Sequence, residues 1–156
     1  MIIKQRRDNI AHMNTMGAID SRQSAIIDDF SQLNTWEDRY RHIIEMGKQL
    51  PPMSEADKIE DLKVRGCQAQ VWLKAELHAD KTIHFIADSD ALIVKGLIAI
   101  LLKIYSDRTA QEILSTEPQF ISALGLAQHL SPSRANGLVA MIKQIKYYAL
   151  GYQAMN

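Results

Sequence analysis

The spacing of apolar residues changes twice along the chain, and these changes limit the folds open to it. Residues 20–50 repeat apolar side chains at helical spacing, whereas residues 71–87 alternate apolar and polar side chains with a period of two. The residues expected on the buried side of two strands are Val71, Leu73, Ala75, Leu77, Ile83, Phe85 and Ala87. Helical spacing returns after residue 90, which predicts an α+β fold with a small antiparallel sheet packed against helices.

Local signals place the ends of the predicted elements. The predicted helices cover residues 20–33, 35–47, 59–62, 91–105, 109–115, 120–124 and 132–150. The expected N-terminal caps are Ser21 or Asp20, Thr35, Ser54, the run Asp88-Ser89-Asp90, Thr109 and Ser131. Gly47 is expected to end the second helix, and a hairpin is expected at residues 78–81. A third short strand near residues 63–66 is a weaker expectation.

Length and charge exclude several classes of protein. The chain has 156 residues, which suits one compact domain, and 18 basic residues balance 18 acidic ones. A net charge of zero argues against a nucleic-acid binder, which normally carries a basic excess. The longest apolar run, residues 91–102, contains Lys95 and is too short to span a membrane. Residues 1–17 show no clear period and are expected to form a disordered extension before a domain at 18–156.

Cys67 is the one cysteine of the sequence, so no internal disulfide and no multi-cysteine metal site can form. Gly66 precedes it, and glycine permits a positive φ, while Arg65 and Gln68 make the flanks polar. We therefore expect a loop thiol at the mouth of a strand. One unpaired cysteine and no visible secretory signal favour a reducing compartment, the cytoplasm.

Four blocks of sequence, in order, resemble the SufE/CsdE family of sulfur acceptors that serve cysteine desulfurases. They are residues 36–51, residues 66–73 (Gly-Cys-Gln-Ala-Gln-Val-Trp-Leu), residues 88–99 (Asp-Ser-Asp-Ala-Leu-Ile-Val-Lys-Gly-Leu-Ile-Ala) and residues 126–138 (Leu-Ala-Gln-His-Leu-Ser-Pro-Ser-Arg-Ala-Asn-Gly-Leu). The resemblance covers about residues 24–150. It implies an α+β fold shared with iron–sulfur scaffold proteins of the IscU type.

The resemblance also implies a function. Cys67 would accept persulfide sulfur from a desulfurase of the SufS or CsdA type, stimulate that enzyme, and pass the sulfur to a SufB-like iron–sulfur scaffold. The protein would be a carrier rather than an enzyme in its own right. Pyridoxal phosphate would belong to the desulfurase, so no cofactor or metal is expected here, and neither nucleic acid nor membrane is an expected partner.

Several side chains are candidates for supporting Cys67. Arg134 would place a cation near the thiol and favour the thiolate, or contact a partner. Gln68 and Gly66 would shape the loop, and His129 is a candidate base. Asp88 is interpreted more simply as a helix cap.

Three other functions remain open. A cysteine-dependent transferase would need Cys67 beside a base such as His129. An iron–sulfur scaffold would need more ligands than one cysteine, unless a dimer shared them. A regulatory partner of a desulfurase would stimulate it without any transfer of sulfur.

Overall fold

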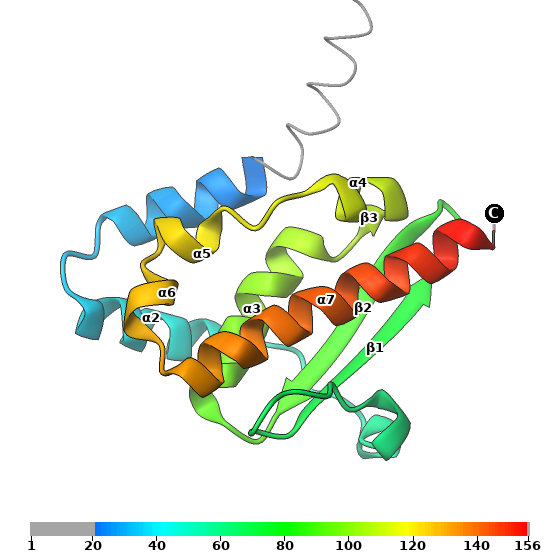
Figure 1. The fold of residues 1–156 in the computed structure, drawn as a ribbon, viewed down its shortest axis with the longest axis horizontal. Helices are drawn as coiled ribbons and strands as arrows, with labels where there is room; N and C mark the ends of the chain where they lie inside the picture. The colour runs from blue at the N-terminus through cyan, green and yellow to red at the C-terminus, as the bar shows by residue number, and fades with distance from the viewer. Residues whose placement is uncertain (1–20, 156) are drawn as a thin grey trace, which may run out of the picture.

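The computed structural model describes residues 21–155, so the expected extension at residues 1–17 lies outside the described residues. The elements follow the predicted α+β order (Figure 1). After a first helix that ends at residue 31 come α2 (Trp36–Lys48), the short 3₁₀ turns η1 (Glu55–Asp57) and η2 (Glu60–Leu62), β1 (Val71–Leu77), β2 (Thr82–Ser89), α3 (Leu92–Tyr105), β3 (Arg108–Thr109), α4 (Ala110–Ser115), α5 (Phe120–Ala123), α6 (Leu126–His129) and α7 (Pro132–Ala154).

The sheet is antiparallel in the order β1-β2-β3. β1 and β2 pair from Val71 with Ser89 to Leu77 with Ile83, which confirms the predicted hairpin. The third strand was predicted at the wrong place. Residues 63–66 form only an isolated bridge, between Lys63 and Trp72, because the chain turns away at Gly66. The third strand is β3, which pairs with the start of β2.

The core lies between the sheet and α3, with α7 running diagonally across the sheet in front of it (Figure 1). Five of the strand side chains predicted to face inward are buried: Val71, Leu73, Ile83, Phe85 and Ala87. The prediction is wrong for Leu77, which is exposed at the end of β1, and Ala75 is only partly buried. α7 also protects the outer edge of β1. The hydroxyls of Tyr148 and Tyr152 donate hydrogen bonds to the carbonyls of Leu73 and Ala75, both at 3.1 Å. These bonds satisfy backbone groups that an edge strand would otherwise leave open.

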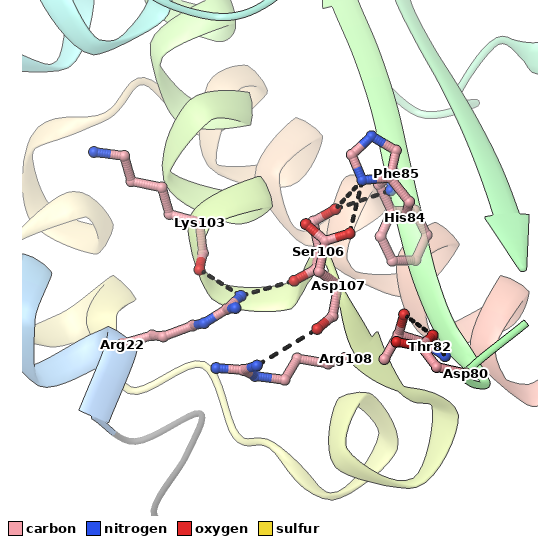
Figure 2. Close-up of polar contacts among 9 residues, drawn as sticks. All are labelled: Arg22, Asp80, Thr82, His84, Phe85, Lys103, Ser106, Asp107 and Arg108. Atoms are coloured by element: carbon pink, nitrogen blue, oxygen red, sulfur yellow. Dashed lines mark hydrogen bonds and ion pairs between the residues drawn. The ribbon is translucent and has the colours of Figure 1, made fainter. Parts of the chain in front are cut away.

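A polar network ties the end of α3 to the sheet and to the first helix (Figure 2). The Arg22 guanidinium donates to the carbonyls of Lys103 at 3.0 Å and Ser106 at 2.7 Å. The Ser106 hydroxyl accepts a hydrogen bond from the Phe85 N–H at 2.9 Å. The network satisfies carbonyls that the end of a helix leaves unpaired.

Most predicted caps are confirmed. Thr35, Thr109 and Ser131 accept hydrogen bonds from backbone N–H groups in the first turns of α2, α4 and α7. The cap predicted at Asp88-Ser89-Asp90 is wrong, because β2 continues to Ser89 and the N-cap of α3 is Ala91, whose side chain makes no cap bond. α7 also continues beyond the predicted end, to Ala154, and the helix predicted at 59–62 is the η2 turn.

The prediction that Gly47 ends α2 is wrong, because the helix continues to Lys48. Gly47 instead lies where α2 packs against α3. A Cβ atom on Gly47 would lie 2.6 Å from the backbone nitrogen of Gly96, and one on Gly96 would meet the backbone of Ile43. The two helices therefore touch backbone to backbone. This close approach explains why a helix as buried as α3 contains a glycine.

Replacing Gly96 with alanine should destabilise the fold, because neither backbone can move aside for the added methyl group. Overpacking of this kind costs about 1–3 kcal/mol, which urea denaturation can measure. The matched control is Gly151→Ala in α7, where an added Cβ has nothing within 4 Å. Equal stability of the Gly96→Ala variant and the wild type would contradict the packing described here.

Candidate functional site

A left-handed turn positions the candidate thiol. Val64 is buried and its N–H donates to the Val71 carbonyl at 2.8 Å, which holds the start of the loop against β1. Gly66 then adopts a φ of 91°, the conformation that its place before Cys67 predicted. The turn directs Cys67 toward the first half of α7.

The Cys67 side chain is half-buried and packs against α7. Its Sγ lies 3.6 Å from the Gly137 carbonyl oxygen, to which the thiol donates a weak hydrogen bond. A Cβ on Gly137 would lie 3.4 Å from the same Sγ, so a larger side chain there would press on the sulfur. Sequence reasoning missed Gly137 as a site residue. A glycine inside a long helix is itself the signal, since it costs stability without a packing reason.

A cavity of about 410 Å³ opens beside the sulfur. Cys67, Gln68 and Ala69 form one wall, and another is formed by Ala91, the N-cap of α3, with Val94 and Leu97 of that helix. Ser131, Ser133 and Arg134 lie at the start of α7, with Gly137 and Met141 further along. The structure thus brings Cys67, Gln68 and Arg134 to one cavity. Gly66 does not line this cavity but precedes Cys67 in the chain. A sulfur atom is similar in size to a water molecule, which occupies about 30 Å³ in the liquid. The cavity is therefore large enough to hold a sulfur atom added to Cys67.

Burial raises the pKa of the Cys67 thiol. Arg134 lines the same cavity, and its predicted effect on the thiolate stays a prediction. Within residues 21–155 the Arg134 guanidinium is exposed and has no hydrogen bond or ion pair. It is therefore free to contact a molecule that enters the cavity.

Of the two carboxylates predicted to cap α3, Asp90 instead holds the far end of the loop, and Asp88 pairs with two lysines. Asp90 accepts a hydrogen bond from the Gln70 N–H at 3.0 Å, and its own N–H donates to the Gln70 carbonyl at 3.3 Å. Asp88 is buried between the ammonium groups of Lys58 at 3.2 Å and Lys95 at 3.4 Å. Burial opposes ionisation of Asp88, but the Ser89 N–H and Lys58 outweigh it and lower its pKa.

Two other candidates lie differently from what was expected. His129 stacks on Trp36, with ring centroids 4.6 Å apart and planes 11° from parallel, and no contact joins it to Cys67 in the described part of the chain. Gln68 is exposed at the cavity rim, and its side chain forms no hydrogen bond with residues 21–155. Among residues 21–155 the structure thus places no base against the thiol.

Among residues 21–155 no three or more His, Cys, Asp and Glu side chains come together where they could hold a metal ion. None of the helices described is long and apolar enough to cross a membrane.

The raised pKa gives a direct test of the Cys67 environment. The rate of alkylation by iodoacetamide should rise with pH through a midpoint above the value of about 8.5 typical of a free thiol, because only the thiolate reacts. The protein unfolded in urea is the control, and its midpoint should be the ordinary one. A midpoint in the folded protein at or below that of the unfolded chain would contradict the burial described here.

Comparisons with known proteins identify the family of the chain. Residues 24–149 match the family model described as SufE: Fe-S metabolism associated domain. An uncharacterized SufE-like protein of Rhizobium meliloti is 47% identical over 130 residues, which cover 81% of this chain and 93% of the relative. One of Rhizobium etli is 46% identical over 125 residues, 78% of this chain and 84% of the relative.

A solved structure shares the fold. The solution structure of a hypothetical protein from Thermus thermophilus has a TM-score of 0.71 and 19% identity, and the match covers 85% of this chain and 96% of that one. At this identity the likeness speaks for the fold alone. The family match and the two relatives go further: the chain belongs to the SufE family, whose domain is associated with iron–sulfur metabolism.

Proposed function

We propose that the protein accepts sulfur on Cys67 from the persulfide of a cysteine desulfurase and carries it to an iron–sulfur assembly scaffold. The observation that carries the proposal is the half-buried thiol beside a cavity of about 410 Å³, in a chain of the SufE family. The donor would be an enzyme of the SufS or CsdA type and the recipient a SufB-like scaffold. Pyridoxal phosphate acts in the donor, so this protein needs no cofactor of its own.

The proposed transfer is one exchange step between two cysteines. The Cys67 thiol loses its proton, and the thiolate attacks the terminal sulfur of the donor persulfide. The bond between Cys67 and that sulfur forms while the sulfur–sulfur bond of the donor breaks, and the donor leaves as a thiolate that takes up a proton. No external oxidant or reductant is consumed, because the sulfane sulfur only changes its partner.

The site suits such a carrier for two reasons. A persulfide on Cys67 has no second cysteine in its own chain to attack it and release the sulfur as sulfide. The cavity also offers room for the extra sulfur beside α3 and α7, away from bulk thiols. A lone thiol of this kind fits the reducing conditions of the cytoplasm, where we expect the protein to act.

The thiol of Cys67 must lose its proton before it can accept sulfur. Burial raises the pKa of Cys67, so the thiolate is scarce near neutral pH in the isolated protein. Docking of the donor would have to bring a base or a cation to the sulfur, or draw the loop outward into water. A transferase that acts alone is less well supported, since His129 stacks on Trp36 and not on Cys67.

Replacement of Cys67 by serine should abolish the stimulation of the desulfurase, because the oxygen cannot take over the sulfur. The measurement is sulfide released per minute from free cysteine by the SufS- or CsdA-type enzyme that the wild type stimulates. Circular dichroism and urea denaturation should show that the variant remains folded.

A second variant tests whether the thiol must lie at position 67 or whether a thiol elsewhere on the protein is sufficient. Ser122 is exposed on α5, so Cys67→Ser combined with Ser122→Cys restores a thiol outside the cavity. This double variant should remain inactive. Full stimulation by Cys67→Ser alone would instead show a regulatory partner that transfers no sulfur.

A further inference from the structure

A second hollow lies on the other side of the Cys67 loop. It has a volume of about 650 Å³ and is bounded by the chain before Cys67 and by one face of α7. We call it the α7 groove and define it by six of its residues, Asp61, Arg65, Gly66, Val139, Lys143 and Tyr147. None of the residues that line the Cys67 cavity lines this groove. Gly66 nevertheless places the groove one residue from the thiol.

The face of α7 in the groove exposes apolar side chains that the fold does not cover. Val139 is 45% exposed and Tyr147 is 72% exposed. Leu150, 54% exposed, lies on the same face three residues after Tyr147. Single exposed apolar residues are ordinary, but three that share one helix face, with Lys143 between the first two, offer apolar contacts of the kind that bind another protein.

The charges of the groove favour an acidic partner. Arg65 and Lys143 are exposed, and among residues 21–155 neither has an ion pair or a side-chain hydrogen bond. The ammonium of Lys63, also in the groove, already pairs with Glu60 at 3.1 Å. Asp61 is the one carboxylate among the residues that line the groove. The chain as a whole has no net charge, so this positive excess is local.

We infer that the α7 groove is the docking site of the sulfur donor, which binds through a segment that carries carboxylates beside apolar side chains. The inference rests on the proposed function. Apolar contacts with Val139 and Tyr147 supply binding energy, while Arg65 and Lys143 set the orientation and accelerate the encounter. A donor held there lies beside Gly66, one residue from Cys67, and its persulfide reaches the sulfur once docking draws the loop outward from the cavity.

The test is the concentration of this protein that gives half-maximal stimulation of the desulfurase. For the double variant Arg65→Glu and Lys143→Glu we expect this concentration to rise roughly tenfold or more, because two attractions become repulsions at the partner surface. Val139→Asp should have a similar effect through lost apolar contact. The matched control is Lys103→Glu, the same change at an exposed lysine of α3 that lines other cavities, and it should behave as the wild type.

A second readout separates this inference from the proposed function. All groove variants should gain a sulfur atom on Cys67 from glutathione persulfide at the wild-type rate, because this small donor needs no docking surface. Wild-type stimulation by the groove variants, with Cys67→Ser inactive, would overturn the groove and leave the carrier function standing. Slow reaction with the small donor would also overturn it, since the groove would then act on the thiol itself.

A second copy of this chain is the other candidate occupant of the groove. Sedimentation velocity of the purified protein should show the same species for the wild type and for Val139→Asp. A wild-type dimer that becomes a monomer in the variant would assign the groove to self-association and overturn the inference.

Discussion

The position of the thiol depends on the contact between the Cys67 loop and α7. Gly137 has no side chain, so the backbone of α7 can come close to the sulfur, and its carbonyl oxygen lies 3.6 Å from the Cys67 Sγ. Gly66 makes the matching contribution from the loop, since its positive φ turns the chain toward the helix. Hydrogen bonds at Val64 and Gln70 hold both ends of the loop to the hairpin. The sulfur is therefore held by backbone contacts rather than by a base or a cation.

The partial burial of Cys67 makes the thiol less reactive but shields it from other molecules in solution. A buried thiol with a raised pKa reacts slowly with electrophiles in solution, and a persulfide in the same place would be shielded from other thiols. Under the proposed function, the same partial burial means that a docked donor has to change the environment of the sulfur before transfer. The Arg134 side chain is exposed at the cavity rim and unpaired among the described residues, so in that proposal it is available to contact the donor.

Sequence reasoning succeeded where the determining interactions are local. The caps at Thr35, Thr109 and Ser131 involve groups within three residues, and the alternation along β2 up to Ala87 follows from one buried face. It failed where the partner lies far along the chain. Asp90 bonds to Gln70, twenty residues away, and Gly47 meets Gly96 on another helix, so neither role could be derived from the flanking residues. β3 has two residues and exists only because β2 pairs with it.

The most direct test of the central claim is the intact mass of the whole protein after incubation with a cysteine desulfurase and free cysteine. We predict a gain of one sulfur atom, located on Cys67 by fragmentation and removed by a reducing agent. A desulfurase that turns over rapidly in the presence of this protein while the mass of the protein never changes would contradict the account.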